Sequence, residues 1–222
     1  MFRWTEATGM QDLGLPAQGT TVRFLSEDGS LMIGHIRTDH STIIFRWSES
    51  AGLQFLGTLG GARAEVTGIT WDGSVLVGWS QTASGQTHVF RWTEATGMQD
   101  LGPGDRIVIS PDGLVMAWSI RGQRVIYWHQ GRALSLSELP LLKKQGVHPG
   151  TVWGVSSDGR SLLISAADGR SWGDPCFPDG GHGFEGRCLL YITLPFGDAN
   201  YDGVVDEADL LAVFFNFGSD CR

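Results

Sequence analysis

The sequence lacks several features that identify well-known classes of protein. It has only three cysteines in 222 residues, and they form neither a CxxC spacing nor a His/Cys cluster, so a zinc site has no support. No apolar run is long enough to span a bilayer. No basic stripe is present of the kind that neutralises phosphates, and the formal net charge is −8, so nucleic acid is not an expected partner.

Catalytic motifs and a secretion signal are also missing. There is no GxSxG, HExxH or phosphate-binding glycine motif, so the sequence favours a protein that is not an enzyme. The first residues, MFRW, do not resemble a signal peptide. Either the protein stays inside the cell or its true start is missing. We favour the second, because the chain begins inside a motif that elsewhere forms the second half of a unit.

The sequence is rich in glycine and tryptophan and contains an internal repeat. The chain has 32 glycines and nine tryptophans, which is typical of short aromatic-rich strands joined by tight turns. The sequence FRWTEATGMQDLG occurs at Phe2–Gly14 and again, unchanged, at Phe90–Gly102. A degraded copy, FRWSESAGLQFLG, occupies Phe45–Gly57. The composition and the copies predict an all-β repeat array.

Asp-Gly pairs set the period of this array. They end at Gly29, Gly73, Gly113 and Gly159, each between two β-rich runs, and we expect type I′ hairpin turns in which the aspartates only form the turn. Four short strands fit each full unit, and a period of 40 to 46 residues is typical of a β-propeller blade. The prediction is a β-propeller-like array of about four four-stranded repeats; a β-solenoid or an open series of meanders fits the same spacing.

The tryptophans and arginines of the repeat are expected on opposite faces of each sheet. We expect the tryptophans to pack between neighbouring blades: Trp4, Trp47, Trp92 and Trp128. The arginines would pair with acidic loop residues or be solvated: Arg3, Arg46 and Arg91.

The patterns SxDGxxxxG, THVFRW and GMQDLG, with GTLGG at Gly57–Gly61, resemble the HAF repeats of bacterial proteins. The resemblance covers residues 1–139 and, more loosely, 150–194. It implies a secreted, propeller-like array at residues 1–195, located outside the cell or on its surface, with no established reaction.

The C-terminal acidic segment has the spacing of a calcium loop. Oxygen donors stand at positions 1, 3, 5, 7, 9 and 12, with Gly203 at position 6 for the sharp turn. The expected calcium ligands are Asp198, Asn200, Asp202, Asp206 and Asp209 through their side chains and Val204 through its carbonyl. A solvated acidic turn is the alternative.

The aspartate ending of this loop, the preceding Gly197 and the run ADLLAVFFNFG resemble one half of a type I dockerin. The resemblance covers residues 197–218 and predicts a second domain at residues 196–222. It implies calcium-dependent folding and a cohesin-like protein partner. Only one of the two dockerin halves is present, and Glu207 and Ala208 replace the usual pair of hydroxyl residues.

A glycine-rich insertion interrupts the fourth unit at Ala166–Arg187. Cys176 and Cys188 could close it with a disulfide, or all three cysteines could be reduced. We predict a secreted, non-catalytic β-propeller protein whose calcium-binding tail serves attachment or protein assembly. The alternative is a propeller enzyme or binding module for polysaccharide; an enzyme of that kind needs two carboxylates about 5 to 9 Å apart.

Overall fold

A computed structural model describes most of the repeat array. The described residues are 1–16, 18–26, 28–129, 131–138, 142, 147–159, 161–168 and 187–193, with the backbone alone at 132, 147, 166–168 and 187–193. The predicted calcium ligands, Cys176 and the predicted boundary at residue 195 lie outside these residues, and Cys188 is described by its backbone alone.

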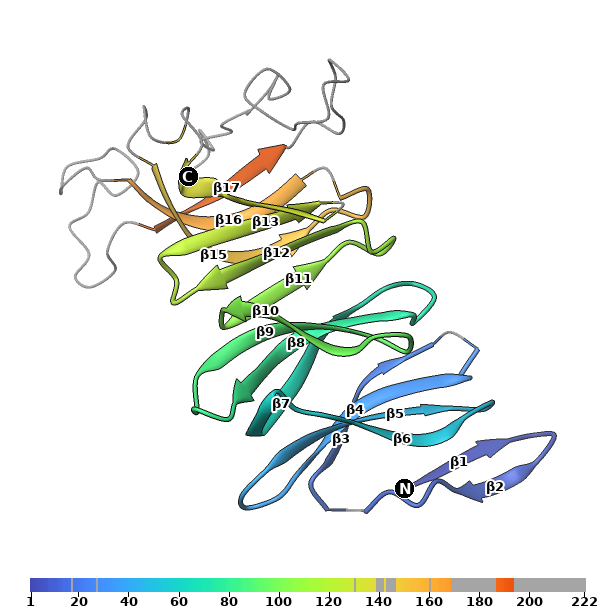
Figure 1. Cartoon of the computed structure of the whole chain (residues 1–222). Coiled ribbons are helices and arrows are strands. Elements are labelled where there is room, and N and C mark those ends of the chain that lie inside the picture. The colour runs from blue at the N-terminus through green and yellow to red at the C-terminus, as the bar shows by residue number, and fades with distance from the viewer. Residues whose placement is uncertain are drawn as a thin grey trace, which may run out of the picture. The chain divides into compact units, whose positions relative to one another are not determined.

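The strands form consecutive antiparallel meanders (Figure 1). A first hairpin precedes them, made of β1 (Phe2–Thr5) and β2 (Gly9–Asp12). Sheet 1 contains β3 (Thr20–Leu25), β4 (Leu31–Arg37), β5 (Thr42–Ser48) and β6 (Gly52–Gly57). Sheet 2 contains β7 (Gly60–Ile69), β8 (Val75–Thr82), β9 (Thr87–Thr93) and β10 (Gly97–Pro103). A parallel bridge between Thr42 and Arg63 connects β5 to β7.

The third and fourth repeats follow the same order. Sheet 3 contains β11 (Arg106–Ile109), β12 (Val115–Ile120), β13 (Arg124–His129) and β14 (Arg132–Ser135), followed by a short 3-10 helix, η1 (Leu136–Glu138). Sheet 4 has three strands among the described residues, β15 (Val147–Val155), β16 (Ser161–Asp168) and β17 (Arg187–Thr193). The four-stranded period predicted from the sequence is confirmed.

Two compact units divide the chain, Met1–Gly104 and Asp105–Arg222. In the first unit, one core cluster joins Phe45 and Trp47 of sheet 1 to Leu13 and Leu15, which follow the first hairpin. A second cluster lies between sheets 1 and 2, and its members are Ile33, Ile44, Ala64, Val66, Leu76, Phe90 and Trp92. Both faces of sheet 1 are therefore used in packing.

In the second unit, the core lies between sheets 3 and 4. Val115, Ala117 and Tyr127 of sheet 3 pack with Leu162 and Ile164 of sheet 4. Burial raises the pKa of Tyr127 to about 12, because the phenolate form would lose its hydration. Like the first unit, this one is stabilised mainly by apolar contacts between neighbouring sheets, since a single sheet cannot exclude water from its own faces.

The Asp-Gly turns have a different geometry from the one predicted. In the first turn, the Gly29 amide donates to the Ser26 carbonyl (2.9 Å), and Gly29 has a φ of 68°. Among the described non-glycine residues, only Arg121 has a positive φ, so Asp28 does not adopt the left-handed conformation that a type I′ turn requires. The type I′ prediction was wrong, because the tight turn precedes the glycine and only the glycine is left-handed.

Candidate functional site

The four Asp-Gly turns share one hydrogen-bond pattern. In the first, the Ser26 hydroxyl donates to Asp28 Oδ1 (2.6 Å) and accepts from the Leu31 amide (2.9 Å). The equivalent hydroxyls of Thr70, Ser110 and Ser156 each donate to the aspartate two residues later. The hydroxyl and the carboxylate together therefore close each turn.

In two of the turns, these hydrogen bonds also favour the ionised form of the carboxylate. Bonds from the Ser26 hydroxyl and the Ser30 amide lower the pKa of Asp28 to about 2. Bonds from the Ser74 amide and the Thr70 hydroxyl lower the pKa of Asp72. An ionised carboxylate that accepts hydrogen bonds within its own turn is poorly suited to general acid catalysis, which agrees with the predicted structural role.

Arginine and tryptophan of the FRW motif meet between neighbouring sheets in the first unit. The Arg3 guanidinium lies over the Trp47 ring, 5.1 Å from its centroid, and pairs with Glu49 (3.2 Å). The Arg46 guanidinium lies over the Trp92 ring at 5.9 Å. The expected acidic partner is thus found for Arg3. The stacking of each arginine on the tryptophan of the next sheet was not predicted.

A group of charged side chains surrounds His35 on the face of sheet 1 that packs against sheet 2. The His35 side chain is only 4% exposed, and no described group forms a hydrogen bond with its Nδ1. Glu65 accepts a hydrogen bond from Arg37 (3.0 Å) and lies 3.8 Å from Arg23. Burial lowers the pKa of His35; the Glu65 charge opposes this shift and the two arginines add to it. A neutral imidazole is thus part of the folded state.

His88, which the repeat motif carries, lies within hydrogen-bond distance of Asp100. The distance between His88 Nδ1 and the nearer Asp100 oxygen is 2.8 Å, across strands β9 and β10. The same carboxylate accepts a hydrogen bond from the Gly102 amide (2.7 Å). These contacts connect the two outer strands of sheet 2.

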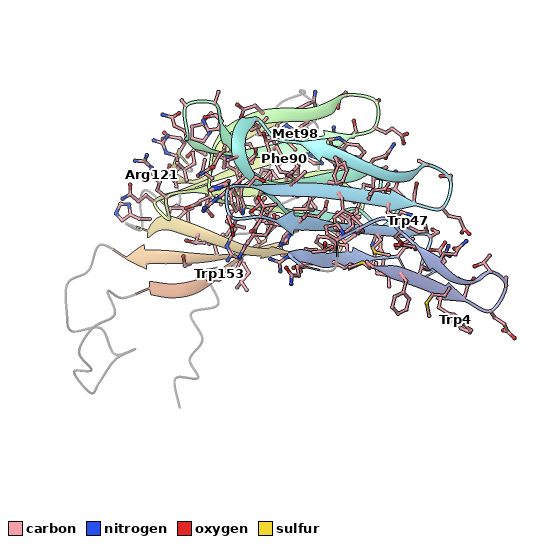
Figure 2. All side chains as sticks on the ribbon, turned by 90° about the horizontal axis from the view of Figure 1, so that it is seen from below. Trp4, Trp47, Phe90, Met98, Arg121 and Trp153 are labelled. Atoms are coloured by element: carbon pink, nitrogen blue, oxygen red, sulfur yellow. The ribbon has the colours of Figure 1, made fainter. Side chains whose placement is uncertain are left out.

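The first hairpin exposes one apolar face, which we call the hairpin face and define as Phe2, Trp4 and Met10. Their exposed fractions are 62%, 64% and 69%. The register pairs Trp4 with Met10, so all three side chains lie on the same side of the hairpin. Arg3 lies on the other side, over Trp47. In Figure 2, Trp4 points away from the sheet that carries Trp47.

In sheet 2, the residues equivalent to the hairpin face are covered by other side chains. Phe90 is fully buried and Trp92 is 7% exposed, and the half-buried Met98 packs against the same cluster. Ile33 and Ile44 of sheet 1 supply the cover. Sequence analysis placed all four repeat tryptophans between blades. This is confirmed for Trp47 and Trp92; Trp128 is only half-buried, and for Trp4 the prediction was wrong, because no described segment packs on that face.

The described part of the chain has no group of three or more histidines, cysteines or carboxylates placed to hold a metal ion. The six calcium ligands predicted at residues 198–209 fall outside that part, and so does most of the glycine-rich insertion. No helix among the described residues is long and apolar enough to cross a membrane.

No protein-family model matches the chain, and no curated protein matches it. Solved structures do match the chain. A TolB-type protein from Agrobacterium tumefaciens is 13% identical with a TM-score of 0.50, over 76% of this chain and 59% of that one. The tricorn protease is 11% identical with a TM-score of 0.56, over 94% of this chain and 21% of that one.

The β-propeller domain of Cps50 (Swd1) from Myceliophteria thermophila is 14% identical with a TM-score of 0.48, over 81% of this chain and 53% of that one. The chain therefore spans 59% of the TolB-type protein and smaller shares of the other two. At sequence identities this low, structural similarity supports a statement about the fold and not about the activity. The repeat array has the fold of a β-propeller.

Proposed function

We propose that this chain is a non-catalytic β-propeller module that binds another protein and works outside the cell. The observation that carries the proposal is the hairpin face. Three large apolar side chains are about two-thirds exposed, whereas the same residues in an identical sequence are covered by another sheet. A concentrated apolar surface of this kind is typical of a protein-binding site.

The distribution of carboxylates supports a non-catalytic role. The turn aspartates recur once per sheet, at Asp28, Asp72, Asp112 and Asp158, and each accepts a hydrogen bond from the hydroxyl of its own turn. A glycoside hydrolase needs two carboxylates that act on one bond. The resemblance to HAF repeats supports a location outside the cell, which can be checked by fractionating a culture of the source organism and detecting the protein in the medium.

The interaction is tested with variants of the exposed tryptophans. We expect one protein from the culture fluid of the source organism to be retained by wild type and lost with Trp4→Ser. Trp71→Ser is the matched control, because Trp71 is 85% exposed in the Asp-Gly turn between β7 and β8 and is not part of the hairpin face. The retained protein is identified by mass spectrometry and its Kd measured by calorimetry; equal Kd values for wild type and Trp4→Ser would contradict the proposal.

The second part of the proposal is that the C-terminal loop binds calcium and serves attachment. Its donor set consists of the carboxylates of Asp198, Asp202, Asp206 and Asp209, the amide oxygen of Asn200 and the carbonyl of Val204, all hard oxygen ligands that suit calcium. Bound calcium would supply the charge that holds these acidic residues together.

Calorimetric titration of the full chain with calcium tests this part. We expect one site in wild type, its loss in Asp198→Ala and Asp202→Ala, and no change in Asp220→Ala, an acidic residue outside the loop. No heat of binding in wild type at millimolar calcium would contradict it.

A further inference from the structure

Asp-Gly pairs are places where a polypeptide chain readily rearranges without an enzyme, because glycine has no side chain to obstruct the reaction. This chain has seven such pairs. The glycine amide nitrogen bonds to Cγ of the aspartyl side chain, while the carboxyl OH and the amide proton leave together as water. Water then opens the five-membered ring. Opening at the main-chain carbonyl gives isoaspartate, whose backbone is one methylene longer, and opening at Cγ restores aspartate.

In the four Asp-Gly turns of the array, which we call the repeat turns, the attacking nitrogen is already bound to another group. The Gly29 amide donates to the Ser26 carbonyl (2.9 Å). The amides of the other three glycines donate to the equivalent carbonyls at 2.9 to 3.0 Å: Gly73, Gly113 and Gly159. Ring closure requires this amide to lose its proton, so the hydrogen bond has to break first.

The aspartate carboxylate is held by a separate pair of donors. Oδ1 of Asp28 accepts from the Ser26 hydroxyl (2.6 Å) and from the Ser30 amide (2.9 Å). Oδ1 of Asp72 and Oδ1 of Asp112 have the same two kinds of donor, at 2.5 to 3.0 Å. These bonds stabilise the ionised carboxylate, whereas water leaves readily only from a protonated carboxyl group.

One residue engages both of the groups that would have to react. In the first repeat turn, the Ser26 carbonyl accepts from the Gly29 amide and the Ser26 hydroxyl donates to the aspartate. The same hydroxyl accepts from the Leu31 amide (2.9 Å), which joins the turn to the next strand. The nitrogen and the carboxyl carbon are therefore kept in different hydrogen bonds of one closed turn.

The sequence separates the four repeat turns from the other three Asp-Gly pairs. Every repeat turn has a hydroxyl residue two positions before the aspartate: Ser26, Thr70, Ser110 and Ser156. In the other three pairs, that position holds a residue without a hydroxyl: Ala166, Phe177 or Asn200. The hydroxyl therefore accompanies the turns of the array and not every Asp-Gly pair.

We propose that the Ser/Thr hydroxyl of each repeat turn is a positioning group that protects the Asp-Gly bond from rearranging to isoaspartate. This role adds to its part in closing the hairpin. The hydroxyl keeps the turn closed and the carboxylate turned to its own donors, so that the ring forms only after the turn opens. An array that uses the same reactive pair in every sheet thus carries its own protection at each copy.

The test compares the full chain in the folded state with the same chain unfolded in guanidinium chloride, both kept at neutral pH and at one temperature. Isoaspartate is measured separately at Asp28, Asp72 and Asp112 by mass spectrometry with electron-transfer fragmentation, which distinguishes it from aspartate. We expect it to form at least about tenfold more slowly at all three sites in the folded chain, because ring closure then depends on local opening of the turn.

Substitution of the hydroxyl separates its effect from that of folding. Ser110→Ala should raise the rate at Asp112 about tenfold, because the carboxylate loses its hydroxyl donor, and should leave the rates at the other repeat turns unchanged. Ser110→Thr is the matched control, since Thr70 fills the equivalent position, and should keep the wild-type rate. If Ser110→Ala does not fold, Ser26→Ala repeats the test at Asp28, in a turn whose hydroxyl–carboxylate bond is exposed.

Equal rates in the folded and the unfolded chain would overturn the inference. An unchanged rate at Asp112 in a folded Ser110→Ala variant would do the same. A rise of equal size at every repeat turn, together with a lower midpoint of guanidinium unfolding, would also overturn it. The alanine would then act through the stability of the whole chain and not through the hydrogen bonds of its own turn.

Discussion

Residues 2–14 and residues 90–102 have the same sequence and the same local structure, but different surroundings. Both form a two-stranded hairpin in which phenylalanine pairs with aspartate and tryptophan with methionine. The turn glycines Gly9 and Gly97 have φ values of 66° and 65°. Trp4 is 64% exposed, however, and Trp92 only 7%. Thirteen residues thus determine the pairing of their own strands but not their burial, which depends on distant segments.

The largest effect is expected from truncating the two tryptophans. Trp92→Ala should lower the free energy of unfolding by about 3 to 5 kcal/mol, because it leaves a cavity between sheets 1 and 2. Trp4→Ala should lower it by less than about 1 kcal/mol, since an exposed side chain leaves no cavity. Urea unfolding of both variants measures the difference. Equal losses would mean that the hairpin face is covered in solution.

A smaller effect is expected from the glycine that lies opposite Phe90. Gly78→Ala should cost about 1 to 3 kcal/mol, because a Cβ there would lie 2.9 Å from the Phe90 ring and 2.0 Å from the Glu65 carbonyl oxygen. Gly154→Ala is the matched control, as a strand glycine with no atom within 4 Å of an added Cβ. Thermal unfolding of the two variants compares them. A harmless Gly78→Ala would show that the Phe90 ring and the Glu65 backbone can both move, so that the buried copy is less tightly held than its exposure suggests.

The smallest effect is expected in the pH dependence of stability, through His35 on the face of sheet 1 that packs against sheet 2. Because the folded-state pKa of His35 is lowered, the unfolded chain binds the proton more readily as the pH falls below about 6.5, the ordinary pKa of histidine. Stability should be complete above that pH and decrease towards the lowered folded-state pKa. His35→Gln should flatten the dependence of the unfolding free energy on pH between 7 and 5, whereas His40→Gln, at an exposed histidine, should not. An unchanged slope in His35→Gln would assign the acid sensitivity to other groups.

The strands could be predicted because their signals are local. The β-rich runs on either side of each Asp-Gly pair of the repeat form strands, and each of these four pairs forms a turn, because hydrophobic alternation and turn residues act over a few positions. The conformation of the turn was mispredicted because the Ser26 hydroxyl, two residues before the aspartate, was not considered. Its hydrogen bonds to the Asp28 carboxylate and the Leu31 amide favour a tight turn followed by a left-handed glycine.

The surfaces could not be predicted because they depend on contacts between sheets. The sequence of residues 2–14 does not indicate that Trp4 is exposed, because the identical segment at residues 90–102 has its tryptophan, Trp92, buried. The group around His35 combines residues from β3, β4 and β7, so no spacing in the sequence indicates it. The calcium ligands at residues 198–209 remain a prediction that calorimetry can test.

In the first unit, each FRW strand places its arginine on one side of the sheet and its tryptophan on the other, so the two faces of a sheet are not equivalent. Arg3 stacks on Trp47, and Arg46, on the other face of the same strand as Trp47, stacks on Trp92. Any repeat that carries the FRW motif can receive a cation from the preceding sheet and offer one to the following sheet. A repeat inserted by gene duplication could form the same arginine–tryptophan contact with the sheet on either side. The array could therefore lengthen without a new type of contact between sheets.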